Sequence, residues 1–89
     1  MEIIEFSNLA DYLKNGREIE FSYNGKEYSI TNHSGLWHLC DDTDRILIET
    51  ICGFDEKDVL ISKAATIILD DLTIEQIFDG QVYEKIFIL

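Results

Sequence analysis

The dipeptide Asn24-Gly25 constrains the fold of this chain more than any other feature of the sequence. Segments that alternate apolar and polar residues flank it, and both of its residues tolerate the positive φ angles of a type I′ turn. With these two residues as the loop, Phe21 faces Tyr28 and Ile19 faces Ile30. The sequence therefore predicts a β-hairpin whose register and core-facing side are both set.

The other side of the predicted hairpin is polar. Successive side chains of a strand point to opposite faces, so the residues between the apolar ones share the second face. These residues are Glu18, Glu20, Glu27, Ser29 and Thr31. We expect this second face to lie away from the core.

Two further strands are expected after the hairpin, giving an antiparallel β-meander of four strands over residues 17–51. The third strand, at 36–40, places Trp37 and Leu39 on one face. The fourth segment, at 45–51, is less regular because its large apolar residues fall on both faces. It is either a strand that is partly covered on both faces or a helix.

Three short helices are expected, each preceded by a capping residue. The caps are Ser7, Asp55 and Thr73, and the helices span about residues 8–15, 56–64 and 74–79. The third start is the clearest, because Thr73 and Gln76 form a capping box. At the second start, Phe54 and Val59 are expected to form a hydrophobic staple, with Val59 buried.

Two more strands, near residues 66–70 and 82–88, complete the predicted fold. The apolar run Ile86-Phe-Ile-Leu89 either pairs within the chain or forms a homodimer through this C-terminal strand. A chain of 89 residues has one modest core, so residues 1–89 are expected to form a single domain. The fold class is α+β, with the meander packed against short helices.

The chain is strongly acidic, with a formal net charge of −11. Residues 32–89 hold twelve acids and four bases, a net of −8. Direct binding to nucleic acid or to an anionic membrane is not expected, because both need clustered Lys and Arg. The acids either keep the protein in solution or form a face that fits a basic protein partner. The candidate face comprises Asp41, Asp42, Asp44, Asp55, Glu56, Asp58, Asp70, Asp71 and Asp79.

The sequence carries no signal for export or membrane insertion. Residues 1–6 lack the positive charge and long apolar run of a signal peptide, and no apolar run approaches the roughly 20 residues of a membrane-spanning helix. Cys40 and Cys52 are therefore expected to be reduced thiols. Together these features predict a cytoplasmic protein.

Motifs for catalysis, metal binding and cofactor binding are missing from the sequence. His38 and Cys40 share a strand face and Cys52 could approach Cys40 across a hairpin, but a zinc site needs about four ligands at fitting spacings. A pair of either thiol with His33 lacks the positive charge that would activate the sulfur. A small chain is also expected to have little room for a ligand pocket of about 300 Å³. We expect no catalytic residue, no metal and no cofactor.

The segment Gly16–Ile30, of the form GREIEFxYNGKxYSI, and the following Gly35-Leu-Trp37 resemble the opening of a recurrent group of small uncharacterised bacterial proteins. The similarity covers roughly the first 40 residues of the chain. No activity is attached to that group, so the resemblance implies only a bacterial, cytoplasmic protein without enzymatic activity.

The leading functional hypothesis is a small acidic interaction or regulatory module that binds another protein. One alternative is a nucleic-acid mimic, of phage or mobile-element type, that inhibits a DNA-binding protein and needs acids spaced along one face. Another is a structural protein that associates with itself through its C-terminal strand.

Overall fold

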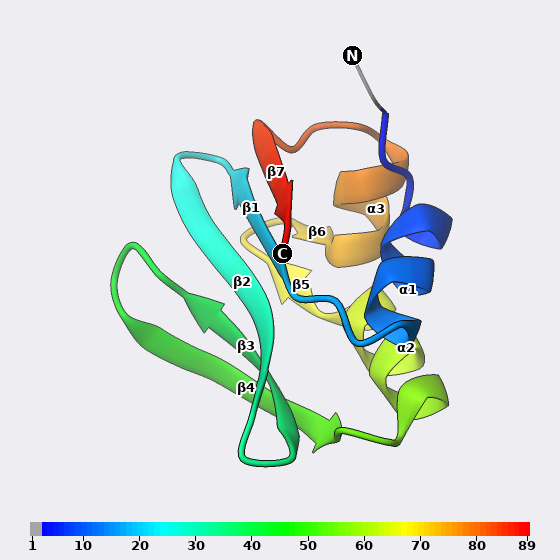
Figure 1. The fold of residues 1–89 in the computed structure, drawn as a ribbon. Helices are drawn as coiled ribbons and strands as arrows, with labels where there is room; N and C mark the ends of the chain where they lie inside the picture. Colours follow the sequence, from blue (N-terminus) through cyan, green and yellow to red (C-terminus); the bar gives the residue numbers. More distant parts are fainter. Residues whose placement is uncertain (1–2) are drawn as a thin grey trace.

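The computed structural model describes residues 3–89 and has the predicted α+β fold (Figure 1). Its elements are α1 (Phe6–Lys14), β1 (Ile19–Tyr23), β2 (Lys26–His33), β3 (Leu36–Asp41), β4 (Ile46–Gly53), α2 (Lys57–Thr66), β5 (Ile68–Leu69), β6 (Leu72–Thr73), α3 (Ile74–Asp79) and β7 (Lys85–Ile88). Five strands form an antiparallel sheet in the order β4-β3-β2-β1-β7, and β5 pairs with β6 separately.

The three helices contact one another and lie on one face of the five-stranded sheet (Figure 1). We call the opposite face the outer face. Its central residues are Glu20, Ser22, Glu27, Ser29, Thr31 and Cys40. Within residues 3–89, none of the helices has the length and apolar character needed to cross a membrane.

The predicted hairpin is confirmed in every detail of its register. Ile19 lies opposite Ile30, Phe21 lies opposite Tyr28, and all four side chains are buried. Asn24 and Gly25 have φ angles of 52° and 80°, as a type I′ turn requires. The local turn chemistry therefore sets the pairing of the two central strands.

The core lies between the sheet and the helices, and Trp37 is its largest fully buried side chain. Its ring stacks on Phe54 at 5.6 Å between centroids and 7° between planes, and its indole N–H donates to the Phe54 carbonyl oxygen at 3.1 Å. Leu9 and Leu13 of α1 are fully buried in the same core. The β3 strand and the chain just before α2 are thereby joined at one point.

The predicted start of the first helix is wrong by two residues. The helix begins at Phe6 and its N-cap is Glu5, whose backbone N–H donates to the Asn8 side chain at 3.0 Å. The backbone N–H of Phe6 donates to the Asp79 carboxylate at 2.9 Å. This long-range partner, with the burial of the Phe6 ring, extends the helix beyond the Ser7 cap that local sequence favours.

The predicted start of α2 is also wrong, by one residue. Its N-cap is Glu56, and the Glu56 carboxylate accepts a hydrogen bond from the Gly53 backbone N–H at 2.8 Å. Phe54 stacks on Trp37, and Val59 is 37% exposed where the staple needed it buried. A tertiary aromatic contact has replaced the local one.

The segment at 66–70 is only partly a strand, because α2 continues through Thr66 and β5 covers Ile68–Leu69. The third helix agrees fully with its prediction. It spans Ile74–Asp79, and Thr73 and Gln76 form the capping box, with bonds of 2.9 and 3.1 Å.

The irregular segment at 45–51 is strand β4 and not a helix. Its pairing with β3 has two register shifts, and Ile48 and Ile51 are left without partners at these bulges. The expectation that both faces would be partly covered holds for Ile51, which is buried, but is wrong for Ile46, Leu47 and Ile48, which are 53%, 56% and 38% exposed. The β3–β4 hairpin extends past the helices, so no helix covers its far end (Figure 1).

The C-terminal run forms strand β7 within the chain. It pairs antiparallel with β1, placing Phe87 opposite Glu20 and Ile86 opposite Phe21. The intramolecular alternative is thus confirmed, with β7 at one edge of the sheet. Only one face of β7 is covered by the rest of the chain, because Phe87, which points to the outer face, is 57% exposed. Self-association through this strand stays a prediction.

Candidate functional site

The outer face of the sheet is hollowed into a trough of about 440 Å³. We define the trough by its lining residues, which are Glu20, Phe21, Ser22, Glu27, Tyr28, Ser29, Thr31, Cys40, Asp42 and Phe87. With a second surface hollow of about 550 Å³ beside Phe54, it shows that the expectation of little room for a pocket is wrong. A twisted sheet with one open face can form a hollow without enclosing it in a large core.

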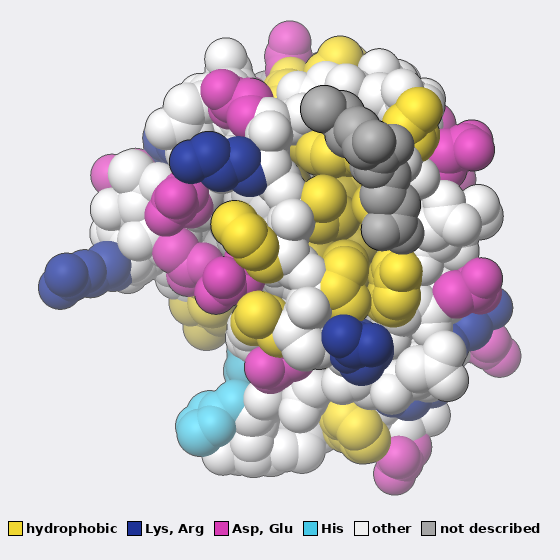
Figure 2. All heavy atoms as spheres, turned by 45° about the horizontal axis from the view of Figure 1, so that its top comes forward, with side chains coloured by type: hydrophobic (Ala, Val, Ile, Leu, Met, Phe, Trp, Pro, Cys, Tyr) yellow, Lys and Arg dark blue, Asp and Glu magenta, His cyan; other side chains and the backbone are white. Residues whose placement is uncertain are grey.

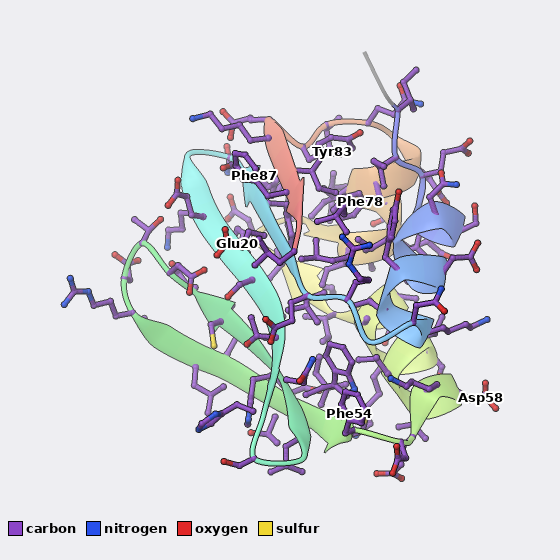
Figure 3. All side chains as sticks on the ribbon, viewed as in Figure 1. Glu20, Phe54, Asp58, Phe78, Tyr83 and Phe87 are labelled. Carbon is purple, nitrogen blue, oxygen red and sulfur yellow. The ribbon has the colours of Figure 1, made fainter. Side chains whose placement is uncertain are left out.

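One row of side chains crosses the trough from edge to edge of the sheet. The strand registers place its members opposite one another in the order Leu47, Cys40, Ser29, Glu20 and Phe87, one from each of the five strands. Figure 3 shows Glu20 and Phe87 close together on β1 and β7. The row is polar in the middle and apolar at both edges.

Three carboxylates line the trough, from Glu20, Glu27 and Asp42. Asp42 lies beside Glu27, because its backbone N–H donates to the Glu27 carbonyl oxygen at 2.8 Å. The lining residues include no Lys, Arg or His, and Lys85 is at the rim, opposite Ser22. The trough is therefore a negatively charged concave surface.

Ser29 provides a polar group on the trough floor. The residue as a whole is only 4% exposed, and it lines the trough. None of the fully buried side-chain polar atoms of residues 3–89 lacks a hydrogen-bond partner, so the Ser29 hydroxyl is not a buried orphan. A serine hydroxyl at this place can donate to or accept from a group bound in the trough.

The two thiols, Cys40 and Cys52, are free and lie at different places along the β3–β4 hairpin. Burial raises the pKa of the Cys40 thiol, and the nearby Asp42 carboxylate raises it further, so the sulfur stays protonated. Cys52 lies opposite Trp37 while Cys40 lies opposite Leu47, so the two thiols do not face each other across the hairpin.

The histidines are likewise separate from the thiols. His38 contacts Thr50 at 3.3 Å, and its ring lies 6.5 Å from that of His33. Among residues 3–89, no three His, Cys, Asp or Glu side chains are grouped so as to hold a metal ion.

The nine predicted site acids are dispersed over the molecule. Asp42 alone lines the trough. Asp55, Glu56 and Asp58 surround the start of α2, at the opposite end of the β3–β4 hairpin from Asp42. Figure 2 likewise shows acidic side chains spread over several parts of one face.

Four of the other predicted acids hold the Asn24-Gly25 turn. Asp71 accepts from the Tyr23 hydroxyl at 2.5 Å, and Asp70 accepts from the Asn24 amide. Asp41 and Asp44 bind the Lys26 ammonium at 3.5 and 3.0 Å. The hydrogen bond to Asp71 is the main reason that the pKa of Tyr23 rises to about 12.

Acidification is expected to weaken the fold through Asp41. The backbone N–H of Asp44 donates to its carboxylate, and with Lys26 nearby this lowers the pKa of Asp41 from its ordinary 3.8. Because the folded-state pKa is the lower one, the stabilisation is complete above the unfolded-state pKa and is lost as the pH falls through the folded-state pKa. Urea unfolding of wild type and Asp41→Asn, from about pH 7 to about pH 2.5, measures it. The difference in unfolding free energy between them should shrink below pH 3.8, and a constant difference would contradict the assignment.

Sequence reasoning missed Glu20, Glu27 and Phe87 as site residues. The alternation around Asn24-Gly25 already placed Glu20 and Glu27 on one polar face with Ser29. That face was the available signal, whereas the position of Phe87 depends on the pairing of β7 with β1. Comparison of this chain with protein-family models, with curated proteins and with solved structures finds no match.

Proposed function

We propose that this protein is a non-catalytic interaction module that binds a basic segment of another protein in the trough. The observation that supports it most is the trough lining, in which the carboxylates of Glu20, Glu27 and Asp42 lie with Ser29 and no Lys, Arg or His is present.

An arginine-containing segment fits this lining best. A guanidinium group donates several hydrogen bonds in a planar fork, which suits carboxylates placed side by side. Glu20 lies opposite Ser29, so one fork can reach both a carboxylate and the serine hydroxyl. The exposed ring of Phe87 beside Glu20 adds an apolar and cation–π surface for the same group.

Removing the charges of Glu20 and Glu27 together is expected to weaken binding of a basic peptide roughly ten- to a hundredfold. The probe is a synthetic peptide that alternates arginine with apolar residues, titrated by calorimetry against wild type and the Glu20→Gln, Glu27→Gln variant. Binding to wild type should weaken as salt is raised, because the attraction is between charges.

The matched control removes two carboxylates elsewhere. Asp58→Asn with Glu75→Gln alters exposed residues of α2 and α3, on the helical side of the sheet. This control should bind the peptide within a fewfold of wild type. Equal weakening by both pairs would show that net charge alone is responsible, and no binding to wild type would reject the proposal.

A further inference from the structure

The outer edge of β4 is an unusual surface for a small acidic protein. β4 is an edge strand, and it carries three consecutive exposed apolar residues, Ile46, Leu47 and Ile48. A sheet edge with exposed apolar side chains and free backbone groups is a template for pairing with another strand. Most proteins protect such edge strands with charged side chains. An apolar edge strand that is left exposed therefore indicates a site where another strand binds.

The backbone of Leu47 is directed to this free edge. The N–H of Asp42 donates to Glu27 on β2, and in an antiparallel ladder alternate residues direct their backbone groups to the same neighbour. Cys40, two residues earlier, therefore directs its groups to β2. Leu47 is the partner of Cys40 on β4, so its own N–H and C=O are directed away from β3 and are free to bind a further strand.

The residues around Leu47 are complementary to themselves. Arg45 precedes the apolar run and Glu49 follows it. β4 begins at Ile46, and Arg45 is the last residue of the preceding turn, with a φ angle of 57°. In an antiparallel two-fold pair of β4 strands centred on Leu47, the turn residue Arg45 of one copy comes alongside Glu49 of the other, at the two ends of the apolar run. The ion pairs found among residues 3–89 involve only Lys26, so neither Arg45 nor Glu49 is paired within its own chain.

We propose that a second copy of this chain pairs with β4, edge to edge, around Leu47, with the Arg45 and Glu49 side chains of the two copies flanking the contact. The occupant is a second copy because the segment is complementary to itself. It has a positive charge at one end, a negative charge at the other and three apolar residues between them, so two antiparallel copies place opposite charges near each other. The pairing joins two five-stranded sheets and buries Leu47 against its own counterpart.

The bulges of β4 limit the backbone pairing to a short segment at Leu47. Ile48 lies at the first register shift, directly after Leu47, and a bulge interrupts a regular ladder. The dimer is therefore reversible and depends on concentration. It leaves both troughs on the same side of the joined sheet, and it does not depend on what the troughs bind.

Sedimentation velocity over a wide range of protein concentration tests the proposal. Wild type should shift from monomer to dimer as the concentration rises. Arg45→Glu alone and Glu49→Arg alone should each weaken the dimer about tenfold or more, because each places like charges opposite one another. The double variant Arg45→Glu, Glu49→Arg should restore the affinity to within a fewfold of wild type.

The other edge of the sheet supplies the control. Phe87→Lys on β7 introduces a charge at an exposed position of the C-terminal strand and should leave the dimer unchanged. Far-UV circular dichroism checks that each variant is folded. A monomer at every concentration, a double variant that fails to regain the dimer, or a dimer lost in Phe87→Lys would each overturn the assignment to β4.

Discussion

Replacing Trp37 with alanine is expected to lower the free energy of unfolding by about 3–5 kcal/mol. Trp37 is fully buried, and its ring lies between the sheet and the Phe54 ring. Its indole N–H also holds the Phe54 carbonyl oxygen, and the Lys57 ammonium lies 5.1 Å from the centre of its ring. The substitution therefore opens a cavity and releases the connection between β3 and the segment before α2.

Urea unfolding followed by far-UV circular dichroism measures this loss, since the variant has no tryptophan to report by fluorescence. A domain of this size has a total stability of about 5–15 kcal/mol, so the variant is expected to be close to unfolding. Trp37→Phe is the matched comparison, because it keeps an aromatic ring and removes the indole N–H. A loss below about 1 kcal/mol in Trp37→Ala would show that the stack does not hold the two segments together.

The sequence could predict those elements whose signals are local. The Asn24-Gly25 turn sets φ angles at two residues, and the register of Ile19 with Ile30 follows from that geometry alone. The Thr73–Gln76 capping box likewise needs only four consecutive residues. The long-range hydrogen bond from Asn24 to Asp70 agrees with the geometry that the turn already favours, so it does not change the prediction.

The elements that differ from prediction are those with long-range partners. Asp79 accepts a hydrogen bond from Phe6, 73 residues away, and α1 begins earlier than its local cap indicates. Phe54 stacks on Trp37, so it is not available for a staple at the start of α2. Such contacts arise from packing and leave no trace in a short window of sequence.

The trough was predictable in part. Strand alternation places the carboxylates of Glu20 and Glu27 on one face, but the acidic composition after residue 40 led to a predicted site made of other acids. The trough also needs the strand order, because Phe87 reaches Glu20 only when β7 adds beside β1. The exposure of the apolar run on β4 depends on its bulges, because a bulge changes the face to which Ile48 and Ile51 point. Hydrophobic periodicity in the sequence does not reveal a bulge.

Replacing Phe78 with alanine is expected to destabilise the protein by about 3–5 kcal/mol, comparable to the loss at Trp37. Phe78 is fully buried in α3, with its ring edge-on to Phe21 at 5.1 Å and stacked on Tyr83 at 5.0 Å. The Tyr83 hydroxyl in turn accepts a hydrogen bond from the Ile4 backbone N–H at 3.0 Å. Phe78 therefore joins the sheet, α3 and the segment before α1, and Figure 3 shows it beside Tyr83.

Phe87→Ala is the matched control, because it makes the same substitution at a phenylalanine that is 57% exposed on the outer face. Its effect on stability should stay within about 0.5 kcal/mol, whereas Phe78→Ala should lower the thermal midpoint by roughly 12 °C or more. Thermal unfolding of both variants side by side separates burial from residue type. Equal shifts would mean that β7 packs as tightly on its outer side as on its inner side, which is incompatible with an open trough. Unequal shifts in the expected order leave Phe87 free to contact a partner while Phe78 holds the fold.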